Sequence, residues 1–397
     1  MKRFSAVFVL ALACMSANAQ FYYQDSRNVD MLHHGTRHQP CRTELILPQV
    51  NGYNVYKADL HTHTVYSDGS VLPKFRIEEA WRDGLDIMAV TEHIEYRPAE
   101  EVLVSYLKRY TDKKYNGESK NTRLNPNKPL DKDGVMVDLN TCVRESQELA
   151  KKYGLTIIPG AEITRDGTTV GHFNALFTTD NNLIYDPDPV VAVRNAKAQN
   201  ALVMHNHPGW RKQSLDMTAT EKTLYEEGLI DGVEVMNGAE FYPGIVDRVK
   251  KYDAFIAANS DIHASTSGDY RVGGSIRPMT LVFAKDKSLA SVREALEEER
   301  TLALGFNTVC GDEQLLKDFF VAGMKTELVK TDAKGRSTVM VTNCTSIPYF
   351  IQVGKNNPIH LLPFSTVSLT SSSDVVKFKV LNMFCSTDGH PVVELKF

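Results

Sequence analysis

Between residues 54 and 306 the chain alternates short apolar segments with longer amphipathic ones, and this alternation limits the possible folds more than any other feature. The apolar segments are rich in Val, Ile and Ala and predict strands over 55–60, 86–91, 155–162, 201–205, 232–236, 255–259 and 279–283. The amphipathic segments predict helices over 72–83, 138–153, 190–199, 218–227 and 244–252. Strands that alternate with helices form parallel sheets with crossover helices. Seven such units favour closure into an α/β barrel over an open sheet.

Groups of histidine and carboxylate residues stand at or just after the ends of these predicted strands. They are Asp59-Leu60-His61-Thr62-His63, Ser67-Asp68-Gly69, Thr91-Glu92-His93, Gly160-Ala161-Glu162, Gly171-His172-Phe173-Asn174, His205-Asn206-His207-Pro208 and Ser260-Asp261-Ile262-His263. The loops after the strands of a β/α barrel converge at one rim. Residues i and i+2 of an extended segment point the same way, so His61 can face one cluster with His63. Imidazole with carboxylate suits zinc, manganese or iron. The pattern therefore predicts a metal site that the fold assembles from distant segments.

The alternative to a metal site is a set of hydrogen-bonded structural residues. That alternative suits His205, which either ends a strand as a buried residue or acts close to the substrate. It does not suit the whole set, because imidazoles and carboxylates buried together without a cation leave polar groups unsatisfied and like charges close together.

The first nineteen residues have the composition of a secretory leader. Lys2 and Arg3 are followed by an apolar stretch over residues 4–14 and by Ala17-Asn18-Ala19 before Gln20. This arrangement predicts a cleaved signal peptide over 1–19 and a protein that is exported to the periplasm or secreted. No later segment has eighteen consecutive apolar residues, so no membrane span is expected.

The remaining composition excludes some classes of partner. Without residues 1–19 the chain has 43 basic and 49 acidic residues, a net charge of −6, and no arginine-rich tract. Nucleic-acid binding is therefore not expected. Five cysteines remain, none in a Cys-x-x-Cys pair. Export allows a disulfide, for which Cys344 and Cys385 are the pair to test, whereas free thiols are the alternative.

Three other segments complete the predicted organisation. Residues 20–53 form a polar N-terminal segment, and residues 105–133 form a polar, basic insertion that is either a solvated loop or a lid over the substrate. The run 171–177 can hairpin back and bring His172 beside Glu162. The predicted helix over 289–300 closes a metal-site domain that spans 54–322. Short β-rich runs then predict a small antiparallel β-sandwich over 323–397.

The order of these motifs resembles the PHP family, named for polymerase and histidinol phosphatase domains. The resemblance covers about residues 54–306 and implies a distorted (βα)7 barrel that hydrolyses phosphate esters at a trinuclear metal site. By motif, the first metal takes His61, His63, Glu162 and Asp261. The second shares Glu162 and takes His172 and His207, and the third takes Asp68, His93 and His263. The ions expected are up to three of Zn²⁺, Mn²⁺ or Fe²⁺.

Two departures from the family's pattern refine this expectation. Glu92 stands where the family more often has aspartate, so it is expected beside the ligands rather than among them. Asp68 replaces a frequent histidine, which makes the third site better suited to manganese or iron. The signal peptide and the C-terminal sandwich exclude the polymerase-associated role. The segments Glu162-Ile163-Thr164-Arg165, Asn206-His207-Pro208-Gly209-Trp210 and Arg277-Pro278-Met279-Thr280 resemble the family's exported branch, which includes organophosphate phosphodiesterases.

The resemblance therefore implies an exported phosphodiesterase that acts on a small phosphate ester through a hydroxide bridging two metals. Glu162, His205 and Arg165 are the expected catalytic residues, and Arg165, Arg271 and Arg277 are candidate contacts for phosphate oxygens. A salt-bridged structural role is the alternative for each arginine. A phosphomonoesterase of the same family, a hydrolase of amides or lactones, and an exported metal- or glycan-binding protein without activity are the alternative functions. Oligomeric state does not follow from the sequence.

Overall fold

The computed structural model describes residues 22–25, 27–34, 41–98, 138–271 and 275–397. These residues form two compact units that divide between Arg42 and Thr43. In the first unit, β1 (Tyr22–Gln24) and β2 (Leu32–His34) pair as an antiparallel hairpin. The predicted signal peptide and the 105–133 insertion lie outside the described residues, as does the side chain of Arg271.

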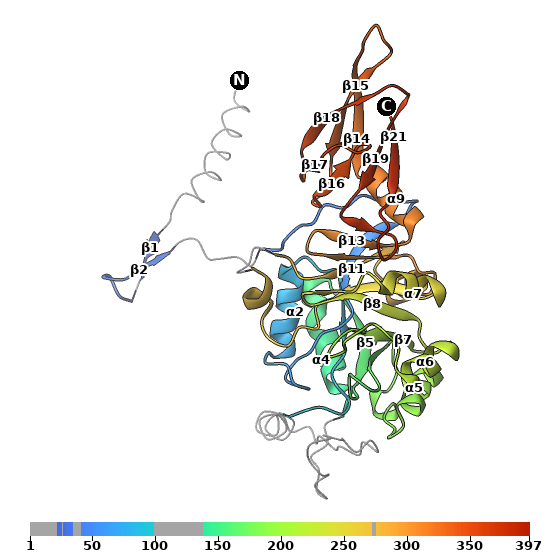
Figure 1. Ribbon diagram of the computed structural model, residues 1–397. Helices are drawn as coiled ribbons and strands as arrows, with labels where there is room; N and C mark the ends of the chain where they lie inside the picture. The colour runs from blue at the N-terminus through green and yellow to red at the C-terminus, as the bar shows by residue number, and fades with distance from the viewer. Residues whose placement is uncertain (1–21, 26, 35–40, 99–137, 272–274) are drawn as a thin grey trace, which may run out of the picture. The chain divides into compact units, whose positions relative to one another are not determined.

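A twelve-stranded mixed sheet forms the centre of the second unit (Figure 1). Its order is β10 (Phe255–Asn259), β8 (Gly232–Asn237), β7 (Leu202–Asn206), β6 (His172–Leu176), β5 (Thr156–Ile163), β4 (Ile87–Val90), β3 (Asn54–Asp59), β11 (Met279–Ala284), β12 (Thr301–Gly305), β13 (Thr308–Gly311) and β20 (Met383–Phe384), with β9 (Glu240–Phe241) paired to β8. The sheet curls. Beyond the carboxyl ends of its strands, Thr62 after β3 forms a parallel bridge with Ile262 after β10. This bridge brings the loops after the first and last strands of the barrel together.

The alternation of strands and helices predicted a parallel sheet, but some strands of the observed sheet are antiparallel. The short connection between β5 and β6 contains no helix, so β6 runs antiparallel to both β5 and β7. β11 also runs antiparallel to β3. The predicted hairpin over 171–177 is confirmed as β6. The other pairs along the sheet from β3 to β10 are parallel, and β9 pairs antiparallel with β8 beside them. The fold is therefore an α/β fold whose mixed sheet curls into a half-barrel, consistent with a PHP-type barrel.

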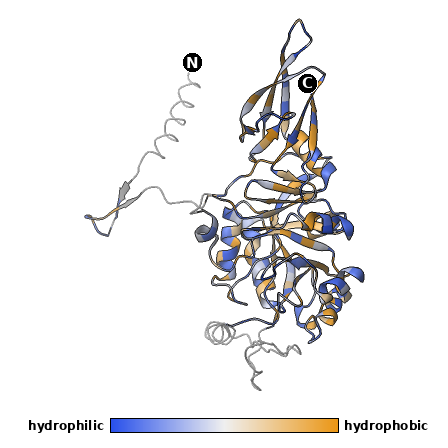
Figure 2. Cartoon of the chain, in the orientation of Figure 1, coloured by the Kyte–Doolittle hydropathy of each residue, from blue (hydrophilic) through white to orange (hydrophobic). Residues whose placement is uncertain are grey.

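Helices cover the outer face of this sheet, each against an apolar cluster (Figures 1 and 2). They are α2 (Pro73–Arg82), α4 (Thr141–Ala150), α5 (Pro189–Ala198), α6 (Ala219–Glu226) and α7 (Ile245–Lys251). The helix α8 (Leu289–Glu297) instead packs against the apolar cluster on the other face of the strands. Local signals start several of them. Pro189 follows the N-cap Asp188 of α5, and Thr218 with Glu221 forms a capping box at α6. Within the described ranges, every helix is too short or too polar to span a bilayer.

Two antiparallel sheets follow the barrel and share one apolar core. One contains β14 (Met324–Thr331), β15 (Ser337–Asn343) and β18 (Thr366–Ser371). The other contains β16 (Tyr349–Gln352), β17 (Ile359–Leu361), β19 (Val375–Val380) and β21 (Val392–Lys396). Their alternating buried residues join α9 (Glu313–Ala322) and β11–β13 in a single hydrophobic cluster. β20 adds a strand to the barrel sheet itself, so these sheets are continuous with the barrel core. Cys344 and Cys385 are free thiols in this structure.

Candidate metal centre

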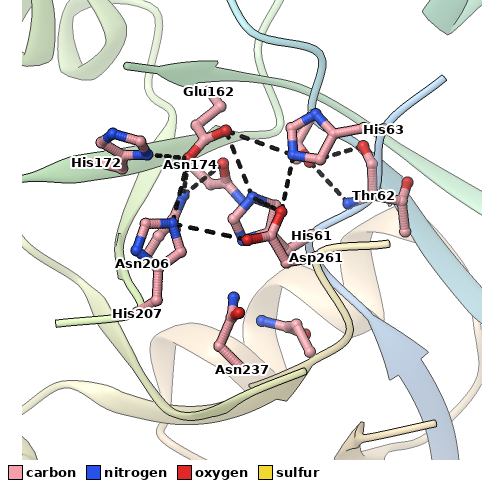
Figure 3. A network of polar contacts seen from close by, with 12 residues as sticks. His61, Thr62, His63, Glu162, His172, Asn174, Asn206, His207, Asn237 and Asp261 are labelled. Carbon is pink, nitrogen blue, oxygen red and sulfur yellow. Dashed lines mark hydrogen bonds and ion pairs between the residues drawn. The ribbon is translucent and has the colours of Figure 1, made fainter. Parts of the chain in front are cut away.

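Nine histidine and carboxylate side chains converge at the carboxyl rim of the curled sheet. His61 and His63 follow β3, His93 follows β4, His207 follows β7, and Asp261 and His263 follow β10. Glu162 lies in β5, His172 begins β6, and Asp68 lies in the turn after β3. The structure thus brings all nine sequence-predicted ligands to one place. Figure 3 shows the part of this cluster that is formed by His61, His63, Glu162, His172, His207 and Asp261.

Glu162 and Asp261 lie at the middle of the cluster, between the two histidines of the first motif. His61 Nε2 is 3.1 Å from Asp261 Oδ1 and 3.5 Å from Glu162 Oε2. His63 Nε2 is 3.0 and 3.4 Å from the same two oxygens. His61 and His63 therefore point to a common position, as the i, i+2 spacing predicted.

Two further groups flank this centre. On one side, Glu162 Oε1 lies 3.1 Å from His172 Nδ1 and 3.7 Å from His207 Nε2. On the other side, Asp68 Oδ1 lies 3.3 Å from His93 Nε2 and 3.1 Å from His263 Nε2. The side chain of His263 is 38% exposed whereas that of His61 is fully buried, so the site opens to solvent on the His263 side.

Several of these atoms are buried and close together without hydrogen bonding to one another. His61 Nε2, His63 Nε2, Asp68 Oδ1 and Glu162 Oε2 are inaccessible to water and have no hydrogen-bond partner. Buried polar atoms are nearly always paired, and leaving one unpaired costs about 1–3 kcal/mol. These atoms point their lone pairs at one another without forming hydrogen bonds, which is the arrangement expected of metal ligands. The residues therefore fit divalent cations.

Hydrogen bonds behind the imidazoles determine which ring nitrogen faces the cluster. His61 Nδ1 is 3.0 Å from Glu234 Oε1, and His263 Nδ1 is 2.7 Å from the carbonyl oxygen of Asp261. His172 Nε2 is 2.7 Å from the carbonyl oxygen of Arg165. Because these oxygens only accept, each of these nitrogens carries the proton and the opposite nitrogen presents its lone pair to the cluster.

The charges in the cluster shift the pKa values of its members strongly. Burial disfavours a charged His93, but Glu162 and Asp68 outweigh burial and raise its pKa to about 10. Burial, together with the neighbouring His263 and His93, lowers the pKa of His63 to about 3, so His63 is neutral. Burial alone would raise the pKa of Glu162, yet His93 and His61 hold it well below its usual range. The carboxylates are thus ionised at neutral pH, as metal ligands must be.

A buried carboxylate that the sequence analysis missed supports the ligands from behind. Glu234 of β8 accepts hydrogen bonds from His61 Nδ1, from the backbone N–H of His207 at 2.7 Å, and from Asn237 and Asn259. Asn206 similarly donates to Glu162 Oε1 at 2.9 Å. One signal could have identified Glu234: it is a charged residue between the apolar residues Val233 and Val235 of a strand that is buried on both faces.

The backbone around the ligands is held by a buried arginine and is locally strained. Arg76 of α2 donates to the carbonyl oxygens of His63 and His263, at 2.9 and 3.1 Å, and so joins the two ligand loops. His207 and Asp261 adopt positive φ angles of 25° and 51°, which is unusual for residues other than glycine. Such strain occurs preferentially at functional sites, where the surrounding structure maintains it.

The structure corrects the catalytic role expected for His205. Successive residues of a strand face opposite sides. Asn206 points to Glu162, so His205 points outward, where it lies against Tyr225 and Glu221 of α6 at 2.9 and 3.1 Å. His205 is fully buried there, and the structural alternative describes it.

The arginines expected to contact phosphate are also committed to other partners. Arg277 is buried, and its guanidinium donates to Asp59 at 2.5 and 3.1 Å and to Ser260 at 3.0 Å. Arg165 forms an ion pair with Glu95 and donates to the carbonyl oxygen of Asp186 at 2.6 Å. Both therefore occupy the salt-bridged role given as their alternative.

Glu92 lies beside the ligands, as its departure from the family's pattern suggested. It accepts hydrogen bonds from the backbone and hydroxyl of Thr64, at 3.2 and 2.5 Å, and from Ser67. These bonds hold the turn that carries Asp68.

A curled α/β sheet with imidazoles and carboxylates gathered at its carboxyl rim defines an α/β protein with a candidate metal centre. The PHP domain family matches residues 59–297 of the chain. A two-domain protein from Bacteroides vulgatus, containing a predicted PHP-like metal-dependent phosphoesterase, is 31% identical over 91% of this chain and 100% of its own, with a TM-score of 0.77. The chain belongs to the PHP family, as its motifs suggested.

More distant similarities accompany this one. A lesion-specific endonuclease from Pyrococcus furiosus is 16% identical over 65% of this chain and 59% of its own, with a TM-score of 0.36. An amidohydrolase from Chromobacterium violaceum is 14% identical over 53% of this chain and 89% of its own, with a TM-score of 0.34. No curated protein matches the chain.

Proposed function

We propose that this protein is an exported metal-dependent phosphodiesterase. The observation that carries the proposal is the convergence of nine ligand side chains, four of which present buried atoms without hydrogen bonds. Membership of the PHP family and the similarity to a chain containing a predicted phosphoesterase supply the reaction class.

The proposed site holds three divalent ions in a distorted (βα)7 barrel. The ligands of the first are His61, His63, Glu162 and Asp261; of the second, Glu162, His172 and His207; and of the third, Asp68, His93 and His263. Overlapping groups of these residues, with ligand atoms within 4.8 Å of one another, support this division. The carboxylate of Asp68 makes the third position suitable for manganese or iron.

Residues around the centre fix the orientation of the proposed metal ligands. Glu234 directs His61, and the carbonyl oxygen of Arg165 directs His172, while Asn206 holds Glu162. Bound ions would lower the pKa of water and neutralise the charge on phosphate oxygens. Because the positions of the ligands are set before substrate arrives, charge stabilisation needs little reorganisation.

Two aromatic side chains at different edges of the cluster favour a diester over a monoester. The ring of Tyr96 lies 6.0 Å from that of His93, and the ring of Trp210 lies 5.3 Å from that of His207. A phosphodiester has an organic group on each side of phosphorus, and each of these rings can contact one of them. A monoester would leave one of the two rings without a partner.

Export is part of the proposal and rests on the composition of residues 1–19. The organisation proposed with it comprises an N-terminal segment over 20–53, the phosphoesterase domain over 54–322 and the C-terminal β-sandwich over 323–397. Fractionation of cells that express the full chain, with N-terminal sequencing of the product, tests this part. A product that retains Met1 in the cytoplasm would contradict it.

Hydrolysis of bis(p-nitrophenyl) phosphate and p-nitrophenyl phosphate by manganese- or zinc-loaded protein tests the reaction. We expect higher kcat/KM for the diester, abolished in Glu162→Gln together with metal content. Glu240→Gln, which changes an exposed carboxylate on β9, is the matched control and is expected to retain both.

The alternatives correspond to distinct results. Preference for the monoester would identify a phosphomonoesterase. Full metal content without turnover of either ester would count against phosphoester hydrolysis and leave a metal-dependent hydrolase of other substrates or an exported binding protein.

A further inference from the structure

One arginine beside the metal centre has no acidic partner among the residues that the structure describes. Arg211 follows Trp210 in the loop between β7 and α6, and its guanidinium lies 4.2 Å from the centre of the Trp210 ring. Among the residues that the structure describes, no carboxylate forms an ion pair with it, in contrast to Arg165 and Arg277. Arg211 is exposed and is therefore a cation that a ligand can reach.

The position of Arg211 is determined by the packing of Trp210. The Trp210 ring lies 5.2 Å from the ring of His172 and 5.3 Å from that of His207. Gly167 lies so close to the indole that a Cβ there would come within 2.7 Å of it. The guanidinium lies 4.2 Å from the Trp210 ring centre, and that centre lies 5.2 Å from the His172 ring centre, so Arg211 is at most about 9.4 Å from the His172 ring.

The loop is anchored so that, within the described part of the chain, Arg211 is the cation of this loop that is left without an ion pair. The next residue, Lys212, is neutralised by an ion pair with the buried Glu221 of α6. Arg248 of α7 donates to the carbonyl oxygen of Leu215. Arg211 itself has a φ of 58°, a left-handed conformation that residues with a side chain rarely adopt and that persists where the surroundings impose it.

An open groove of about 480 Å³ borders this loop. It is lined by Arg211 and Lys212, by the hydroxyl-bearing residues Thr168, Ser214 and Thr218, and by Gln213, Asp216 and Met217. Asp216, the acidic residue of this lining, accepts a hydrogen bond from Ser214 at 2.8 Å. The groove is thus polar, and the guanidinium of Arg211, which has no ion pair among the described residues, forms part of its lining.

We propose that Arg211 and this groove bind an anionic group on the organic part of the substrate. The preferred substrate is then a phosphate ester that carries a second negative charge, such as a carboxylate or another phosphate. The inference rests on the proposed phosphoesterase function and adds a substrate class to it. A guanidinium held over an aromatic ring suits a planar, bidentate anion, because its donors remain directed outward.

Binding of two phosphonates tests the subsite without turnover. The chain has two tryptophans, so Trp81→Phe leaves Trp210 as the reporter of binding by fluorescence. In this background, metal-loaded protein is titrated with phenylphosphonate and with 3-carboxyphenylphosphonate. We expect the carboxylate to strengthen binding roughly tenfold, as one charge-assisted hydrogen-bonded contact does.

Three variants separate the role of Arg211 from general effects. Arg211→Gln is expected to abolish the tenfold difference and to leave the affinity for phenylphosphonate unchanged. Arg211→Lys is expected to retain part of it. Arg336→Gln, which removes an exposed arginine between β14 and β15, is the charge-matched control and is expected to retain all of it.

Equal affinities for the two probes in the parent protein, or an unchanged difference in Arg211→Gln, would overturn the subsite. If p-nitrophenyl esters are hydrolysed in that case, the proposed function stands and only the subsite fails. If neither probe binds and no ester is hydrolysed, the proposed function fails and the subsite with it.

Discussion

Replacing Glu234 by glutamine tests whether the metal centre depends on the buried carboxylate behind it. Oε1 accepts from His61 Nδ1 at 3.0 Å and from Asn259 at 2.9 Å. Oε2 accepts from the backbone of His207 at 2.7 Å and from Asn237 at 2.8 Å. Glutamine keeps one oxygen, so in either orientation its amide nitrogen meets two donors.

The magnitude follows from the two bonds that Glu234→Gln loses. A hydrogen bond to a charged group contributes about 1.5–3 kcal/mol, so the free energy of unfolding is expected to fall by about 3–6 kcal/mol. Metal affinity is expected to fall about 10–100-fold, because His61 or His207 loses the partner that orients it. Urea denaturation measures the first quantity, and competition with a chelator of known affinity measures the second.

Two comparisons make this result interpretable. Glu240→Gln removes an exposed carboxylate and is expected to change neither quantity. Asn237→Ala removes a single donor to Glu234 and provides a milder change if Glu234→Gln does not fold. Metal affinity within twofold of the parent, with stability within about 0.5 kcal/mol, would refute the reasoning for Glu234.

Three other predictions concern the pairings seen around the site. Arg277→Met is expected to lower the free energy of unfolding by about 3–5 kcal/mol, because it leaves the buried Asp59 without its ion-pair partner; unchanged stability in urea with a loss of kcat/KM would instead indicate a substrate contact. His205→Gln is expected to leave kcat and metal content within a few-fold of the parent, and a loss of activity with full metal content would restore the catalytic assignment. Burial alone would raise the pKa of Glu221, but His205 and Lys212 lower it to about 2, below the usual value of about 4.3. This depressed pKa contributes stability that is present above about pH 4 and is lost as the pH falls through about 2, so Glu221→Gln is expected to cost about 3 kcal/mol at pH 7 and less than half of that by about pH 3. Urea denaturation of the parent and of Glu221→Gln at both pH values measures the loss of unfolding free energy. If Glu221 were an ordinary surface residue, this loss would not change with pH.

Much of the barrel could be predicted because its signals are local. Apolar runs of strand length and amphipathic segments between them located β3, β10 and α6 to within a few residues. The strands β12 and β13 and the helix α9 were not predicted, because they lie where the alternation gives way to the β-rich C-terminal region. Pairing direction was also missed at β11, since an apolar run does not specify whether its neighbour is parallel.

Ligand candidates were recognisable for the same local reason. Imidazoles and carboxylates that follow buried strands have few structural explanations, so His61, His63 and Asp261 could be named from spacing and resemblance. Their convergence needed only that the strands end at one rim. The sequence contains no comparable local signal for the acidic partners of the arginines.

Tertiary structure alone decided which polar residues face the site and which bind partners away from it. His205 and His207 are two residues apart, yet a positive φ at His207 directs it to the cluster while His205 packs against α6. Arg277 pairs with Asp59, whereas Arg211 pairs with no acidic residue in the described ranges, although both are arginines near the rim. The sequence by itself determined the strands and the chemistry at their ends, because periodicity and residue type act over a few residues. Closure of the curled sheet determined the pairings, because a buried charge takes whichever partner the fold brings within hydrogen-bonding distance.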